Sequence, residues 1–243
     1  MTISRRLSNA TMRSGWLVIF FVSITECHRH EHEKKFLYFA YGSNLLKTRL
    51  RINAPSAVFI TPARLPGYRL DFDNYSPNWR GAPATIAAIP KGEVWGALWL
   101  LNYSEMGALD EQEGLKDGLY EAIDVKVLNL NNHVITARSY KMTSDPPKVH
   151  PEVLPLQRRP SNTYIQVIAV GAYQCGIPSY YIEFIYRFPT NGRTATDKLS
   201  QELGYPFNEN IQISLKYFFV FLKINNGPFI TFFGTTRYFS LQC

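Results

Sequence analysis

Cysteine is scarce in this sequence, and its spacing excludes two classes of protein. The chain has three cysteines, Cys27, Cys175 and Cys243, and none of them belongs to a Cys-x-x-Cys pair. Small domains held by disulfides need an even, closely spaced set, and zinc knuckles need paired cysteines. We therefore expect neither a disulfide framework nor a structural zinc site, and a reducing compartment is the simpler setting.

Clustered positive charge is missing as well, although the formal net charge is +7. Charged residues make up 19% of the chain, and the basic ones are spread thinly, with Arg158 and Arg159 as the densest pair of the central part. A nucleic-acid-binding surface needs lysines and arginines gathered on one face. We therefore expect no nucleic-acid partner.

Long apolar runs are also absent. The run at 16–24 is too short to cross a bilayer, which takes about 20 apolar residues. Because Arg5, Arg6 and Arg13 precede it, this run has the shape of a signal-peptide core, but no A-x-A cleavage pattern follows. A signal peptide and a disordered extension both remain open. We expect a cytoplasmic protein with no membrane partner, without excluding secretion through residues 1–27.

The rest of the composition is that of a globular protein. Hydrophobic residues make up 46% and aromatic residues 14% of the chain, enough for a sizeable core. We predict an N-terminal extension at 1–35, signal-like or disordered, a compact domain at 36–183 and a phenylalanine-rich C-terminal tail at 184–243. The alternating histidines at 28–32 could face one side of an extended segment, but a solvated tract is the simpler interpretation, so we expect no metal.

Short apolar or alternating runs, separated by proline and glycine, are typical of strands. We predict strands at 36–41, 58–60, 68–72, 84–89, 94–101, 120–130 and 134–142, the last two joined in a hairpin. We predict helices at 45–50, between Ser104 and Gly114, between Ser161 and Gly176, and from Ser179 onward. Strands mixed with a few helices, without regular βαβ alternation, predict an α+β fold whose mixed sheet curls into a small barrel with flanking helices.

The first candidate site is the turn that follows the strand at 36–41. Gly42, Ser43 and Asn44 lie between this strand and the next predicted helix, which Ser43 or Asn44 would cap. Backbone N–H groups exposed at such a turn can hold a carboxylate or a developing oxyanion. A plain structural turn is the open alternative. Because neither a G-x-S-x-G elbow nor a phosphate-binding loop is present, Ser43 is interpreted as a binding or capping residue rather than a nucleophile.

The second candidate site is the acidic segment at 110–113, which ends a short predicted helix. The negative end of the helix dipole disfavours the charged form of Glu113 and raises its pKa toward values useful for proton transfer. A solvated acidic turn is the open alternative. His133 and His150 stand alone, so the sequence does not assemble a catalytic triad.

Taken together and in this order, several motifs resemble the γ-glutamylcyclotransferase family of animals. The matching segments are 36–45, 93–96, 109–114, 118–120, 138–140 and 171–172. The resemblance implies a mixed α/β fold around a small barrel, a homodimer, and a reaction without a metal or organic cofactor. It also implies Glu113 as the catalytic acid/base and, as substrate-binding residues, Tyr38, Phe39, Ala40, Tyr41, Gly42, Ser43, Asn44, Tyr120, Tyr140 and Tyr164. With 15 tyrosines in the chain, core packing is the open alternative for each tyrosine.

The substrate that the resemblance implies is a small γ-glutamyl peptide, whose α-amino group attacks its own γ-carbonyl to give 5-oxoproline. Holding one folded conformer favours the ring closure, and Glu113 would take the proton of the amine and return it to the departing amine. Related enzymes act on glutathione or on γ-glutamyl-ε-lysine and carry other residues in the turn, so Gly42, Ser43 and Asn44 favour γ-glutamyl amino acids. A non-catalytic binding protein of the same fold is the alternative from another class. The similarity fades after about Glu183.

Overall fold

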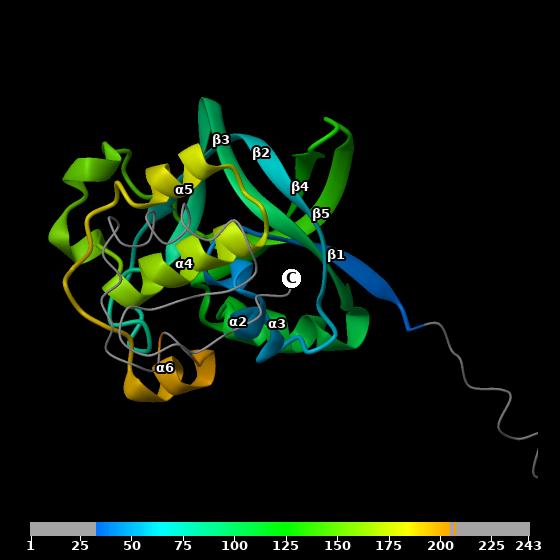
Figure 1. Cartoon of the computed structure of the whole chain (residues 1–243), viewed down its shortest axis with the longest axis horizontal. Coiled ribbons are helices and arrows are strands. Elements are labelled where there is room, and N and C mark those ends of the chain that lie inside the picture. The colour runs from blue at the N-terminus through cyan, green and yellow to red at the C-terminus, as the bar shows by residue number, and fades with distance from the viewer. Residues whose placement is uncertain (1–32, 205–206, 208–243) are drawn as a thin grey trace, which may run out of the picture. The chain divides into compact units, whose positions relative to one another are not determined.

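A closed five-stranded barrel forms the centre of the computed structural model, which describes residues 33–204 and 207. The strands follow one another around the barrel in the order β1, β3, β2, β4, β5 (Figure 1). Their bounds are β1 Lys35–Ala40, β2 Val58–Phe72, β3 Ala84–Asn102, β4 Tyr120–Asn129 and β5 Val134–Met142. The predicted fold class, a mixed sheet curled into a small barrel, is confirmed.

The barrel closes through a single parallel contact. Antiparallel ladders join β1 to β3, β3 to β2, β2 to β4 and β4 to β5. The last gap, between β1 and β5, is bridged by Tyr38 and Arg138 in parallel register. Because closure pairs the two edge strands with each other, no long open edge is left at this point for pairing with another chain.

Two strands are longer than the sequence pattern predicted. The short runs predicted at 58–60 and 68–72 belong to β2, and those at 84–89 and 94–101 belong to β3. Proline and glycine suggested breaks, but the ladder between the two strands absorbs them in register shifts at Phe59/Thr61 and Pro66/Tyr68. Gly67 has a φ of 80° in the second shift, a conformation that glycine adopts without strain.

The helices flank the barrel, with α4 and α5 packed on each other (Figure 1). Their bounds are α2 Lys47–Arg51, α3 Met106–Gln112, α4 Asn162–Gln174, α5 Ser179–Ile185 and α6 Asp197–Leu203. Short 3-10 turns are η1 Ser43–Leu45, η2 Tyr103–Glu105, η3 Leu115–Asp117, η4 Pro151–Val153 and η5 Leu156–Arg158. The start of α4 is confirmed in detail, since Ser161 accepts a hydrogen bond from the Tyr164 N–H at 3.3 Å.

Two helix starts differ from the sequence prediction. The predicted helix at 45–50 is the turn η1 followed by α2, and neither Ser43 nor Asn44 caps it. Ser104 lies inside η2 and does not cap α3 either. The end of α3 is as predicted, because Gly114 follows it with a φ of 67°, in the left-handed region that glycine favours.

Close backbone packing holds the turn after β1 in place. A side chain at Gly171, in the last turn of α4, would bring its Cβ within 2.4 Å of the Leu46 nitrogen and 2.5 Å of the Leu45 carbonyl carbon. Only a glycine lets α4 lie directly on this turn. The candidate turn at 42–44 is therefore fixed from behind by a helix that comes more than a hundred residues later in the chain.

A buried ion pair anchors the long loop between β5 and α4. Arg158 is 6% exposed and bonds Asp71 Oδ1 at 2.6 Å, the Phe72 carbonyl oxygen at 3.0 Å and the Pro147 carbonyl oxygen at 2.8 Å. Three acceptors satisfy most of the buried guanidinium. Of the pair Arg158 and Arg159, Arg158 thus contacts groups within the protein and does not point to an anionic partner.

Residues beyond the predicted domain end at 183 also pack on the core. Phe188 contacts the ring of Phe72 with centroids 4.8 Å apart, and Leu199 and Leu203 of α6 are buried. The limits of the three predicted parts stay predictions, and the phenylalanine-rich runs after 207 and the histidines at 28–32 lie outside the described residues. Among the described residues, no helix combines the length and apolarity needed to span a membrane.

Candidate active site

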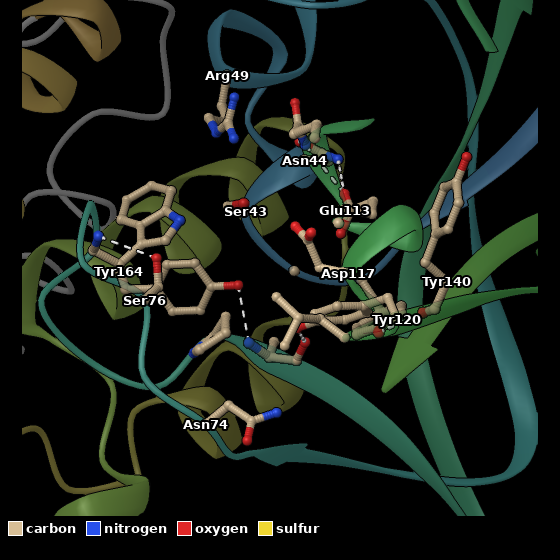
Figure 2. A pocket seen from close by; sticks show the side chains of 18 of the residues that line it. Ser43, Asn44, Arg49, Asn74, Ser76, Glu113, Asp117, Tyr120, Tyr140 and Tyr164 are labelled. Atoms are coloured by element: carbon tan, nitrogen blue, oxygen red, sulfur yellow. Dashed lines mark hydrogen bonds between the residues drawn. The ribbon is translucent and has the colours of Figure 1, made fainter. Parts of the chain in front are cut away.

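A cavity of about 300 Å³ lies where three segments meet: the turn after β1, the loop between β2 and β3, and the end of α3 (Figure 2). Both candidate sites of the sequence open into it. The lining residues include Tyr38, Tyr41, Gly42, Ser43, Asn44, Arg49, Trp79, Ala84, Gln112, Glu113, Asp117, Tyr120, Tyr140 and Tyr164. The volume is at the small end of the range for ligand sites, which suits a compact metabolite.

Glu113 lies at the C-terminus of α3 and presents its carboxylate to the cavity. Its Oε1 accepts hydrogen bonds from Asn44 Nδ2 and Gln112 Nε2, both at 3.1 Å (Figure 2). Although the residue is half-buried as a whole, protein atoms surround the carboxylate, and this burial raises its pKa. The charge of Arg49 and the two hydrogen bonds oppose the rise. A carboxylate with a raised pKa is suited to take up and return a proton.

Asn44 fixes the orientation of this carboxylate. It is 3% exposed, its Nδ2 donates to both Glu113 and the Tyr38 hydroxyl at 3.0 Å, and its Oδ1 accepts from Gln112 Nε2 at 3.2 Å. Every polar atom of the amide is therefore used, which leaves it one orientation. The residue that the sequence offered as a helix cap is instead the link between β1 and the carboxylate.

The turn itself supplies unused backbone donors. The carbonyl oxygens of Gly42 and Ser43 accept from the N–H groups of Leu45 and Leu46 at 3.0 and 3.1 Å. Among residues 33–204, the N–H groups of Gly42, Ser43 and Asn44 donate to no other backbone group. A Cβ at Gly42 would lie 3.4 Å from both Ala84 Cβ and the Tyr164 hydroxyl, so the turn also borders the opposite wall of the cavity closely.

Two tyrosines meet at the first residue of β3. The Tyr120 hydroxyl donates to the Ala84 carbonyl oxygen at 2.7 Å, and the Tyr164 hydroxyl accepts from the Ala84 N–H at 3.0 Å (Figure 2). Burial raises the pKa of Tyr164 to about 12 and that of Tyr120 well above its ordinary value. Both side chains are therefore neutral hydroxyls near pH 7.

The third predicted tyrosine is held by an ion pair. Tyr140 donates to Asp110 Oδ1, which also receives Arg138 Nη2 at 2.7 Å, and Arg138 Nε donates to the tyrosine hydroxyl at 3.0 Å. On the other side, the Tyr41 hydroxyl donates to the Tyr140 carbonyl oxygen at 2.6 Å. Burial and Asp110 raise the pKa of Tyr140, so this hydroxyl is also neutral near pH 7.

The structure thus brings eight of the ten predicted substrate-binding residues to one cavity together with Glu113. Phe39 and Ala40 do not line it. Both are fully buried in the core, where the Phe39 carbonyl oxygen accepts from Ser139 Oγ at 2.9 Å and Ala40 pairs with Ala97 of β3. For these two residues, a contact with substrate stays a prediction that the cavity does not support.

Several cavity residues were not found from the sequence. Gln112 stood beside Glu113 in the acidic segment and could have been assigned as its partner from that position alone. Arg49, Trp79 and Asp117 carried no local signal, because they reach the cavity only through the packing of α2, the loop after β2 and η3. Within the described part of the chain, no group of three His, Cys, Asp or Glu side chains is placed to hold a metal ion.

Known proteins with similar sequences and structures indicate the family to which this fold belongs. Residues 93–185, which include β4, β5, α4 and Glu113, match the model of the AIG2-like family. A solved structure described as a gamma-glutamyl cyclotransferase has a TM-score of 0.63 and 38% sequence identity, and the match covers 70% of this chain and 98% of that one.

Two curated relatives are similar over most of their length. The gamma-glutamylcyclotransferase of Homo sapiens is 43% identical over 175 residues, which are 70% of this chain and 87% of the relative. That of Mus musculus is 44% identical over 162 residues, which are 65% of this chain and 81% of the relative. The chain therefore belongs to the γ-glutamylcyclotransferase family, as the motifs of its sequence predicted.

Proposed function

We propose that this protein is a γ-glutamylcyclotransferase, an enzyme that converts a γ-glutamyl amino acid into 5-oxoproline and the free amino acid. Membership of the family supports the reaction, and the cavity supports the roles of the residues. The observation that carries the proposal is the Glu113 carboxylate, which faces the cavity, is oriented by Asn44 and Gln112, and has a raised pKa.

In the proposed reaction, the α-ammonium group of the substrate first gives a proton to the Glu113 carboxylate. The free amine then attacks the γ-carbonyl carbon, and the carbonyl oxygen becomes an oxyanion. As the tetrahedral centre collapses, the bond between the γ-carbon and the amide nitrogen breaks, and Glu113 returns its proton to the departing amine. The ring nitrogen then loses its remaining extra proton to the same carboxylate, which passes it to the departing amine. Two protons thus move from the attacking nitrogen to the departing one, the products are a neutral lactam and an ammonium group, and no cofactor enters the scheme.

The turn after β1 and the tyrosines supply the surroundings for these steps. The unused N–H groups of Gly42 and Ser43 are donors for the oxyanion, in the role that backbone amides play in acyl transfer. The neutral hydroxyls of Tyr120 and Tyr164 border the same space and add hydrogen bonds without adding charge. The small volume of the cavity also favours the folded conformer in which amine and carbonyl meet.

The finer assignments rest on the resemblance of the motifs. Asn44 in the turn favours γ-glutamyl amino acids over glutathione and γ-glutamyl-ε-lysine as substrates. We also propose a lyase-type enzyme of glutathione metabolism, in the cytoplasm, active as a homodimer. A mature N-terminus in the region of residues 25–28 would contradict the cytoplasmic location.

The test of the proposed function is the release of 5-oxoproline from three substrates by the full chain. We expect release from γ-glutamyl-alanine, and little from glutathione or γ-glutamyl-ε-lysine. In Glu113→Gln the rate on γ-glutamyl-alanine should fall by about 10² to 10⁴, the usual contribution of a general acid/base. Activity on glutathione alone would contradict the substrate assignment. A folded protein that releases 5-oxoproline from none of the three substrates would refute the proposed enzymatic activity.

A further inference from the structure

Arg49 is the one basic side chain that the described residues bring to the wall of the cavity. It lies on α2, behind the turn that carries Ser43, and Figure 2 shows its guanidinium group pointing down toward Ser43 and the cavity. The other charged residues that line the cavity are Glu111, Glu113 and Asp117, all acidic. A single positive charge therefore stands against an acidic wall.

No side chain of the described residues neutralises this guanidinium by contact. Arg49 takes part in none of the ion pairs found among them, and its Nε is buried with no hydrogen-bond partner. Its close neighbour is an aromatic ring, since the guanidinium carbon lies 6.0 Å from the centre of Trp79. Glu113 and Glu202 act on it only at longer range.

A guanidinium in this state is suited to a ligand rather than to the fold. Arg158, which anchors a loop of the fold, differs in that its guanidinium donates to three acceptors. A buried N–H group without an acceptor is unfavourable, and native proteins keep few of them unless a water or ligand completes the site. The Trp79 ring lies beside the guanidinium and uses none of its N–H groups as a hydrogen-bond donor, so they are available for a planar anion.

We propose that Arg49 binds a carboxylate of the substrate and thereby sets the position of the γ-glutamyl chain relative to Glu113. This inference rests on the proposed function. A γ-glutamyl amino acid carries one ammonium group and two carboxylates, and the cavity offers a carboxylate on one side and a guanidinium on the other. The guanidinium fork matches a carboxylate with two parallel hydrogen bonds, which fixes direction as well as position.

Two carboxylates of the substrate have this chemistry. One is the α-carboxylate of the glutamyl group, which becomes the carboxylate of 5-oxoproline, and the other belongs to the departing amino acid. They are distinguished by a substrate that lacks the second one. γ-Glutamyl-alanine amide keeps the α-carboxylate and the reacting atoms but has no charge on the departing group.

The experiment compares Arg49→Gln and Arg49→Lys with the control Lys47→Gln, which removes a positive charge from the same helix away from the cavity lining. On γ-glutamyl-alanine we expect KM to rise about tenfold to a hundredfold in Arg49→Gln, the effect of losing a charge-assisted hydrogen bond. The value of kcat should change less, and Arg49→Lys should recover part of the loss. Lys47→Gln should behave as the unchanged protein.

The dependence on substrate charge identifies which carboxylate Arg49 binds. A rise of KM on the dipeptide alone assigns Arg49 to the departing amino acid. An equal rise on the dipeptide and on its amide assigns it to the α-carboxylate when Arg49→Gln also loses the preference for 5-oxoproline over its carboxamide, a preference that a merely structural effect would leave in place. Either result supports the proposal. If Arg49→Gln remains folded and shows the KM of the unchanged protein on both substrates, Arg49 binds no substrate carboxylate.

A binding measurement keeps this test separate from the proposed reaction. Calorimetric titration with 5-oxoproline and with its carboxamide tests the α-carboxylate without any turnover. If the unchanged protein releases no 5-oxoproline but still prefers the acid to the carboxamide, and Arg49→Gln loses that preference, the reaction is wrong while the carboxylate site stands. If turnover is normal and Arg49→Gln has no effect in either measurement, the reaction stands and the carboxylate site is wrong.

Discussion

Asn44→Ala is the perturbation that tests the geometry of the site most directly. The substitution removes the Nδ2 donor from Glu113 and from the Tyr38 hydroxyl, and it leaves the Gln112 amide without its Asn44 acceptor. Asn44 is 3% exposed, so water does not readily replace these bonds. A hydrogen bond to a charged group contributes about 1.5 to 3 kcal/mol, which corresponds to a loss of about 10- to 150-fold in kcat/KM.

The pH dependence gives the direction of the effect. In the intact site, the Asn44 hydrogen bond lowers the pKa of Glu113 against the rise caused by burial. Without that bond, the charged carboxylate is less stable, so its pKa rises further. Because the carboxylate must start the reaction unprotonated, the acidic limb of the kcat/KM profile should move to higher pH in Asn44→Ala.

The assay is the rate of 5-oxoproline release from γ-glutamyl-alanine across pH, with thermal unfolding measured on the same samples. Asn129→Ala is the matched control, because it also removes side-chain hydrogen bonds, to the N–H groups of Asn131 and His133 in the β4–β5 hairpin, away from the cavity lining. It should leave both the rate and the pH profile unchanged. A folded Asn44→Ala protein with an unshifted acidic limb would refute the assignment of Asn44 as the residue that tunes Glu113.

Three further predictions concern stability and packing. Because the pKa of Glu113 is raised in the folded state, this group favours folding most at low pH, and the advantage is lost as the pH rises through the folded pKa. Glu113→Gln should therefore unfold at an equal or higher temperature than the unchanged protein at pH 7. The difference between the two unfolding temperatures should shrink in acid. Gly171→Ala should cost about 1 to 3 kcal/mol in chemical denaturation and reduce activity, because its Cβ would meet the Leu46 nitrogen at 2.4 Å; unchanged stability and activity would contradict the close packing of α4. Arg158→Ala should cost about 3 to 5 kcal/mol because it leaves Asp71 buried without its closest partner, and an unfolding midpoint equal to that of the unchanged protein would argue against the ion pair.

The parts of the fold that were predicted from the sequence are those with a local cause. The β4–β5 hairpin, the Ser161 cap of α4 and the left-handed Gly114 each follow from a few adjacent residues. The continuity of β2 and β3 was missed, because it depends on a partner strand that absorbs proline and glycine in register shifts. The strand propensity of a segment depends on its own residues, whereas the hydrogen-bonded ladder depends on both of the strands that it joins.

The candidate site divides in the same way. Glu113 and the turn at 42–44 were found because they belong to compact motifs, although the main cause of the raised Glu113 pKa is burial and not the helix dipole on which the sequence argument relied. Arg49 was not predicted as a site residue, because the feature that marks it is a buried Nε without a hydrogen-bond partner, and the order of residues in a sequence does not reveal such a feature. Asn44 was found for its place in the turn but with the wrong local role.

Ala84 contributes nothing but a methyl group and its backbone, and it nevertheless sets the hydrogen-bond polarity of the cavity. Its carbonyl oxygen accepts a hydrogen bond from the Tyr120 hydroxyl, so this hydroxyl has only its lone pairs left and can act toward a ligand only as an acceptor. Its N–H group donates a hydrogen bond to the Tyr164 hydroxyl, which can still act as a donor through its own O–H group. Two chemically identical side chains thereby become opposites, an acceptor suited to an ammonium group and a donor suited to an anion, and a dipolar substrate meets a cavity that already has a direction.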